Sequence, residues 1–169
     1  MADRAPQATG SRFGDILRSL IFAPAFYFGS IFYVLWAATA GAFSNRQFQR
    51  SVAGWSRYHR WCVTHLLAIE VIEENRPPDR ACLYAIKHES FFEAIDMPNL
   101  VANPAVFAKA ELMQIPLWGK AAAAYGLVSV AREEGAKTLR AMIAAARKLS
   151  AEGRPLVILL EGTRVPHGQ

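Results

Sequence analysis

One histidine and three carboxylates lie close together in residues 86–98, IKHESFFEAIDMP, where His88 is followed by Glu89, Glu93 and Asp96. An imidazole with one nitrogen held by a carboxylate has a fixed tautomer and orientation, and it can act as a general base. Such a base can deprotonate an alcohol as the alcohol attacks. Because that hydroxyl can belong to the substrate, no nucleophilic serine or cysteine is required. We therefore expect His88 to be a base that one of these carboxylates orients.

The spacing of Ser90 and Glu93 bears on which carboxylate that is. Ser90-Phe91-Phe92-Glu93 fits the S-x-x-E capping box, in which the glutamate reaches back to the start of a helix. Glu93 could serve only as a cap. Residues five apart in one continuous helix point about 140° away from each other, but a strand-to-helix turn between His88 and Glu93 would let them meet. The roles of cap and of partner to His88 therefore need not exclude each other.

A second polar cluster stands close to the end of the sequence and comprises Glu161, Gly162, Thr163 and Arg164. Gly162 permits a close approach of the backbone, Thr163 offers a hydroxyl, and Arg164 offers a two-pronged donor for a phosphate. Taken alone, the pattern E-G-T-R is short, and it also fits an ordinary polar turn.

Residues 109–119, KAELMQIPLWG, supply a third candidate. Lys109 follows an apolar run, and Pro116 and Gly119 mark a helix boundary. By itself this segment is ordinary in an α/β domain.

Short apolar runs alternate with helical patterns in the second half of the chain. Five runs have the composition of buried strands: residues 69–73, 81–86, 105–108, 127–131 and 156–160. Helical patterns occupy residues 91–100, 117–125 and 134–149. This alternation predicts an α/β sheet flanked by helices, and ligands of such sheets bind at the carboxyl ends of the strands. His88 follows one of the predicted strands directly.

The first half of the chain contains a long apolar segment. No charged side chain occurs in residues 19–45, and a membrane-spanning helix needs about 20 residues. A buried core helix is one alternative. A cleaved signal peptide is another, since Ala38-Thr39-Ala40 resembles a cleavage site, although the preceding region is long and contains Asp3 and Asp15.

Basic and aromatic residues alternate just after this segment, in a chain whose formal net charge is +5. They are Arg46, Arg50, Arg57 and Arg60, interleaved with Phe48, Trp55, Tyr58 and Trp61. The pattern suits a helix in a membrane interface with its arginines on lipid phosphates. Nucleic acid is a rival partner for such a stretch, but the neighbouring apolar segment favours lipid. Cys62 and Cys82 show no metal-binding spacing, and we expect both to be small apolar residues.

Taken in order, these pieces resemble the glycerolipid acyltransferase family, specifically the 1-acyl-sn-glycerol-3-phosphate (lysophosphatidic acid) acyltransferases. The first motif of that family, His-x4-Asp, is similar to His88–Glu93, with glutamate in place of aspartate. Its third motif is the E-G-T-R of residues 161–164. Its second region is similar to a series that comprises Lys109, Leu112, Pro116, Gly119 and Gly126 and leads to Arg132.

The resemblance implies transfer of a fatty acyl group from acyl-CoA or acyl-ACP to the free hydroxyl of lysophosphatidic acid. His88 would be the base and Glu93 its orienting partner. The acceptor's phosphate would be held by Glu161, Gly162, Thr163 and Arg164, with Lys109 or Arg132 assisting. The expected partners are membrane lipid, lysophospholipid and acyl-CoA or acyl carrier protein. No resident cofactor, metal or nucleic acid is expected.

The resemblance also predicts the organisation of the chain. We expect a mobile tail at residues 1–18, transmembrane or interfacial helices at residues 19–67, and the N-terminal part of an acyltransferase α/β domain at residues 68–169. Members of the family continue well beyond E-G-T-R, so the chain is expected to be a fragment of a longer enzyme or a truncated product. An inactive, membrane-anchored remnant that binds lipid is the alternative. The excess of arginines after the apolar segment favours the cytoplasmic side of a bacterial inner membrane for the α/β domain.

Overall fold

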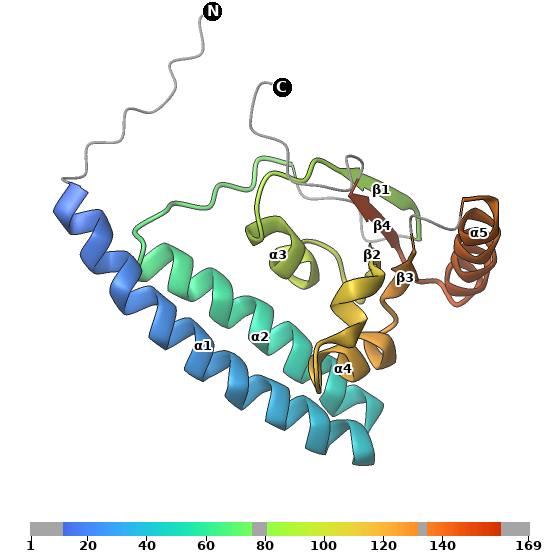
Figure 1. Ribbon diagram of the computed structural model, residues 1–169, viewed down its shortest axis with the longest axis horizontal. Helices are drawn as coiled ribbons and strands as arrows, with labels where there is room; N and C mark the ends of the chain where they lie inside the picture. Colours follow the sequence, from blue (N-terminus) through green and yellow to red (C-terminus); the bar gives the residue numbers. More distant parts are fainter. Residues whose placement is uncertain (1–11, 76–80, 132–134, 160–169) are drawn as a thin grey trace, which may run out of the picture.

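The computed structural model describes residues 12–75, 81–131 and 135–159. A pair of long helices leads into an α/β unit (Figure 1). In chain order the elements are α1 (Arg12–Phe43), α2 (Asn45–His65), β1 (Leu83–Ile86), α3 (Phe92–Leu100), β2 (Ala105–Lys109), the 3-10 helix η1 (Ala110–Gln114), α4 (Trp118–Tyr125), β3 (Val128–Val130), α5 (Ala136–Ala151) and β4 (Leu156–Leu159).

The four described strands form one parallel sheet in the order β1-β4-β2-β3. In its register, Ile86 of β1 lies opposite Leu159 of β4, and Lys109 of β2 lies opposite Val130 of β3. Helices connect the successive strands, as parallel pairing requires. The α/β fold class predicted from the sequence is confirmed.

Helix α3 covers the sheet and also touches α2. Met97 of α3 packs on Val106 of β2 and Val157 of β4, and all three side chains are buried. On the helical side, Ser56 of α2 donates a hydrogen bond from its hydroxyl to the carbonyl of Ile95, over 2.8 Å. Helix α3 therefore links the sheet to the helical pair.

Helices α1 and α2 are joined by side-chain hydrogen bonds and by close packing at a small residue. Tyr58 donates from its hydroxyl to the carbonyl of Ala25 at 2.6 Å, and the Trp55 indole donates to the Ser30 hydroxyl at 2.9 Å. A side chain on Gly29 would place its Cβ 2.2 Å from the Tyr58 ring. The close packing of the two helices therefore depends on glycine at this position.

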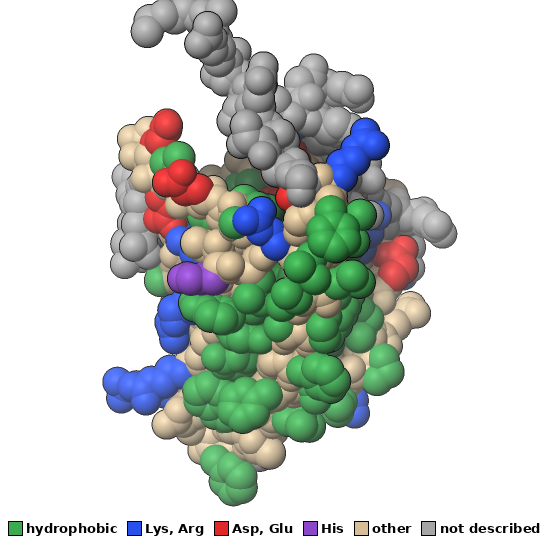
Figure 2. Space-filling view, turned by 90° about the vertical axis from the view of Figure 1, so that its left-hand side faces the viewer, with side chains coloured by type: hydrophobic (Ala, Val, Ile, Leu, Met, Phe, Trp, Pro, Cys, Tyr) green, Lys and Arg blue, Asp and Glu red, His purple; other side chains and the backbone are tan. Residues whose placement is uncertain are grey.

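The outer side of α1 is apolar and exposed. Its large exposed side chains are Phe13, Ile16, Leu17, Leu20, Ile21, Tyr27, Phe28, Ile31, Phe32, Leu35, Trp36 and Phe43. Hydrophobic side chains form a broad patch in the view that faces this side (Figure 2). Helix α1 is long and apolar enough to cross a membrane, a property that signal sequences and core helices of soluble proteins share. A core helix is mostly buried, whereas only 6% of the most apolar stretch of α1 is buried.

The helix begins earlier than the sequence predicted. Residues 12–18, which we assigned to a mobile tail, form the first turns of α1. Asp15 stands in the first turn, where a carboxylate suits the helix dipole, and it pairs with Arg18 at 3.7 Å. The helix therefore begins in a charged stretch that precedes the apolar segment. Residues 1–11 lie outside the described residues.

The predicted strand at residues 69–73 is absent from the described sheet. This segment is tied to α2 instead, because the Ile69 N–H donates to the Val63 carbonyl and Glu73 pairs with Arg60. Ile69 and Ile72 are exposed. The prediction of a buried strand at residues 69–73 is therefore wrong, because the segment binds a helix and leaves its isoleucines exposed.

The arginines of α2 do not all share one environment. Arg46, Arg50 and Arg57 are exposed, whereas Arg60 forms ion pairs with Asp96 and Glu73. The prediction that Arg60 faces lipid phosphates is therefore wrong, because two carboxylates of the protein bind its guanidinium group.

Candidate active site

His88 lies just beyond the carboxyl end of β1. The strand ends at Ile86, and α3 begins at Phe92, so a short turn separates the histidine from the helix. All described strands run in the same direction, and their carboxyl ends share one edge of the sheet. That edge is where ligands of open parallel sheets bind.

The turn brings His88 and Glu93 together. His88 Nδ1 lies 2.7 Å from Glu93 Oε1, and the two side chains are 15% and 17% exposed. Because a carboxylate only accepts hydrogen bonds, Nδ1 is assigned as the donor. This assignment makes Nε2 the nitrogen that can accept a proton.

Ser90 holds the same carboxylate from the other side. Its backbone N–H donates to Glu93 Oε1 and its hydroxyl donates to Oε2, each at 2.7 Å. The Ser90 hydroxyl also accepts from the Phe92 N–H at 3.0 Å. Glu93 reaches back to Ser90 as the predicted capping box requires, but the N-cap of α3 is Phe91, one residue later than that box predicts. Glu93 thus binds the helix start and the histidine at once.

These contacts set the charge state of Glu93. Burial acts to raise the pKa of this carboxyl group. The hydrogen bonds from the Ser90 hydroxyl, from the backbone and from His88 outweigh burial, and the pKa lies below its ordinary value. Glu93 is therefore ionised at neutral pH and can stabilise a positive charge on the imidazole.

The two other carboxylates of the motif have different partners. Glu89 is exposed and forms an ion pair with Lys87 at 3.0 Å. Asp96 is 1% exposed and is bound by Arg60 and Asn99. Of the three, Glu93 has the geometry of an orienting partner. The sequence did not predict that Asp96 binds Arg60. The only local indication was its position three residues after Glu93, on the same helix.

Lys109 is the last residue of β2 and is exposed at the same edge of the sheet as His88. Strand β4 lies between β1 and β2, so the lysine and the histidine belong to strands that are not direct neighbours. The segment that follows is packed tightly: a Cβ on Gly119 would lie 2.0 Å from the Met113 carbonyl oxygen. Gly119 therefore has a structural reason to be glycine.

The other predicted phosphate-binding residues lie outside the described residues. They are Arg132, Glu161, Gly162, Thr163 and Arg164. The described part of β4 ends at Leu159, which lies opposite Ile86, two residues before His88. Within residues 12–75, 81–131 and 135–159, no three His, Cys, Asp or Glu side chains are grouped as a metal site would require.

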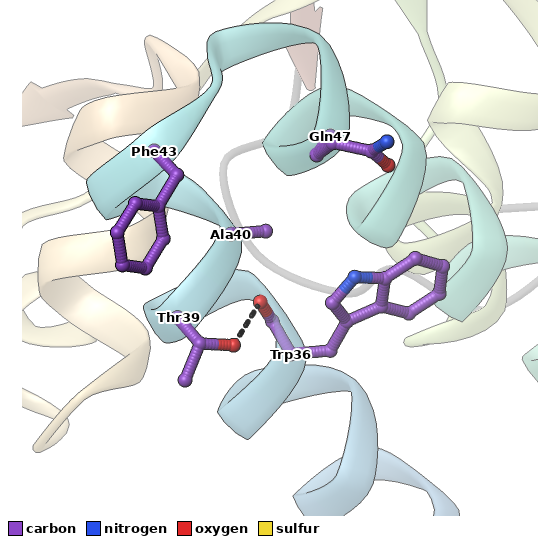
Figure 3. A pocket seen from close by; sticks show the side chains of 5 residues that line it. All are labelled: Trp36, Thr39, Ala40, Phe43 and Gln47. Carbon is purple, nitrogen blue, oxygen red and sulfur yellow. Dashed lines mark hydrogen bonds between the residues drawn. The ribbon is translucent and has the colours of Figure 1, made fainter.

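A shallow hollow exists elsewhere, where α1 joins α2 (Figure 3). Its lining residues are Trp36, Thr39, Ala40, Phe43 and Gln47. The Thr39 hydroxyl donates to the Trp36 carbonyl at 3.0 Å. This hollow contains no acid–base pair and lies on the helical pair, away from the carboxyl edge of the sheet.

Comparison with known proteins agrees with this arrangement. A family model described as Acyltransferase matches residues 68–169. The 1-acyl-sn-glycerol-3-phosphate acyltransferase of Pseudomonas aeruginosa is 26% identical over 152 residues, which cover 89% of this chain and 58% of the relative.

A solved structure is similar as well. It is the crystal structure of the 1-acyl-sn-glycerophosphate (LPA) acyltransferase PlsC from Thermotoga maritima, with a TM-score of 0.67 and 22% sequence identity. The match covers 92% of this chain and 65% of that one, and it supports the fold. The chain thus spans less than two thirds of the length of each of these relatives.

Proposed function

The chain belongs to the acyltransferase family, and we propose that it transfers a fatty acyl group from acyl-CoA or acyl-ACP to lysophosphatidic acid, giving phosphatidic acid. The contact between His88 and Glu93 at the carboxyl edge of the sheet carries this proposal. The acceptor is suggested by the two relatives, both of which are acyltransferases of 1-acyl-sn-glycerol phosphate by name.

The proposed reaction is a direct attack of the acceptor on the thioester. His88 Nε2 removes the proton of the acceptor hydroxyl as its oxygen attacks the thioester carbonyl carbon. Glu93, bound to Nδ1, stabilises the imidazolium that forms. The tetrahedral intermediate then expels the thiolate, which takes the proton from His88, so the histidine returns to its neutral state. The thioester is already activated, so positioning and a base supply much of the catalysis.

Phosphate recognition forms a separate part of the proposal. Glu161, Gly162, Thr163 and Arg164 follow β4, the direct neighbour of β1, in the sequence. We assign the acceptor phosphate to these residues, assisted by Lys109 or Arg132. An arginine can bind a phosphate with two parallel hydrogen bonds, and a lysine adds a point charge.

A membrane location suits this chemistry, because acceptor and product both partition into lipid. The exposed apolar side of α1 would contact the hydrocarbon. Arg46, Arg50 and Arg57 are exposed on the helix that follows and would contact anionic headgroups. We propose the cytoplasmic face of a bacterial inner membrane as the site of action.

Acyl transfer to lysophosphatidic acid, measured in membranes that carry the chain, tests the proposal. We expect His88→Ala to lower the rate about 10²–10⁴-fold, the usual contribution of a general base. His65→Ala is the matched control, because His65 is an exposed histidine of α2, remote from β1. Glu93→Ala should impair transfer far more than Glu89→Ala. Equal rates for the parent chain and His88→Ala would refute the enzymatic function.

A further inference from the structure

A buried ion pair ties the helix that carries Glu93 to the helical pair. Arg60 of α2 donates from Nε to Asp96 Oδ1 at 2.9 Å and from Nη2 to Oδ2, while Asn99 donates to Oδ1 at 2.7 Å. The Asp96 side chain is 1% exposed. Burial of a carboxyl group this deeply is costly unless partners bind both of its oxygens. The guanidinium also reaches Glu73 through Nη1, so the pair is held at both ends.

The ion pair lies close to Glu93 on the surface of α3. Asp96 follows Glu93 by three residues, and side chains at this spacing are neighbours on a helix. Helix α3 has nine residues, too few for stability by itself. Its rotation about its own axis is therefore set by tertiary contacts. A rotation would carry Glu93 away from Ser90 and His88.

The remaining contacts between α2 and α3 are less directional. The Ser56 hydroxyl donates to one backbone carbonyl, that of Ile95. The rings of His59 and Phe92 have centroids 5.5 Å apart in a tilted arrangement. A two-pronged bond from a planar guanidinium group to a carboxylate fixes both distance and angle.

We propose that Arg60 and Asp96 are positioning residues for acyl transfer, because their ion pair fixes α3 in the rotation that keeps Glu93 bound to His88. The effect on rate rests on the proposed function, whereas the effect on the His88–Glu93 hydrogen bond does not. The competing interpretation is that the pair only stabilises the fold.

A paired apolar substitution separates the two interpretations. Replacement of a buried ion pair by apolar residues of similar volume often leaves stability unchanged, so Arg60→Met/Asp96→Val should remain folded. We expect this variant to lose about 100-fold in kcat per folded molecule, since a misplacement near 1 Å can cost this much. The KM values for donor and acceptor should change little. Arg147→Met is the control, because Arg147 is exposed on α5.

A second measurement is independent of activity. Proton–nitrogen NMR of ¹⁵N-histidine-labelled protein detects the Nδ1–H of His88, assigned by its disappearance in His88→Gln. We expect this signal to be protected in the parent chain and lost in both Glu93→Ala and Arg60→Met/Asp96→Val. A folded double variant that keeps the signal, or that keeps full kcat, overturns the positioning role. If the parent chain and His88→Ala transfer acyl groups equally, the proposed function fails, while the NMR comparison still decides the positioning role.

Discussion

Arg60 and Arg154 are both partly buried, and they hold different parts of the α/β unit by different chemistry. Arg60 binds the carboxylates of Asp96 and Glu73 beside the candidate site. Arg154 precedes β4, at the amino ends of the strands, and binds backbone carbonyls. The hydrogen bond to Asp96 raises the pKa of Arg60, whereas burial lowers the pKa of Arg154.

The carbonyls that Arg154 binds belong to the loop before β2 and to the last residue of α4. Its Nε donates to Asn103 at 3.2 Å, and its Nη2 donates to Pro104 and Tyr125 at 2.8 Å each. The guanidinium carbon lies 5.7 Å from the centre of the Tyr125 ring. This arginine joins the start of β2 to the end of α4 through neutral carbonyl groups.

The two sites should differ in the stability that is lost when the arginine is removed. Loss of Arg60 removes the charged partner of Asp96, whose carboxyl group is 1% exposed and stays inside the protein. Loss of Arg154 leaves neutral carbonyl groups, which tolerate desolvation better than a charge does. The Arg60 site should therefore be costlier to break, and the carboxylates beside the candidate site should respond to acid more than the Arg154 site does.

The largest expected effect is that of Arg60→Ala. Removal of one partner of a buried ion pair costs about 3–5 kcal/mol, because the other charge stays buried. We expect the free energy of unfolding to fall by this amount, measured by urea titration with circular dichroism in one detergent. Arg147→Ala, an exposed change of the same type, should stay within about 0.5 kcal/mol. A cost below that of Arg154→Ala would reverse the comparison.

Arg154→Ala should have a smaller effect, of about 2 kcal/mol. Hydrogen bonds to a charged group contribute about 1.5–3 kcal/mol, and water can reach part of the vacated site. Arg154→Lys should recover only part of the loss, because an ammonium group cannot reproduce the planar fork. The same urea titration measures both variants. Full recovery by lysine would mean that charge, and not the directed hydrogen bonds to the loop before β2 and to α4, stabilises this part of the sheet.

The sequence predicted those features that depend on neighbouring residues. The strand-to-helix turn and the reach of Glu93 back to Ser90 follow from the capping pattern, and the α/β class follows from the alternation of short apolar runs and helices. These signals are local, so a single sequence contains them.

Features that depend on distant residues could not be predicted in this way. Arg60 and Asp96 are separated by 36 positions, and nothing in the residue pattern of α2 distinguishes Arg60 from the exposed arginines beside it. The acceptors of Arg154 are backbone carbonyls, which every residue has. Residues 69–73 have the composition of a strand, but whether such a segment joins a sheet is set by the whole fold.

The smallest expected effect concerns acid, and it compares Glu93, a carboxylate of the candidate site, with the Arg154 site. The pKa of Glu93 in the folded protein lies below its ordinary value of 4.5. A carboxyl group with a lowered pKa adds stability above its unfolded value, and this share is lost as the pH falls through the folded value. Glu93→Gln should therefore flatten the fall in unfolding free energy below pH 4.5. Arg154→Ala should lower stability with a smaller change in that slope, because its hydrogen-bond acceptors are backbone carbonyls, which do not titrate. Urea titrations of the three proteins between pH 7 and pH 3.5 provide the comparison, and a slope changed equally by both substitutions would show that acid acts on the whole fold.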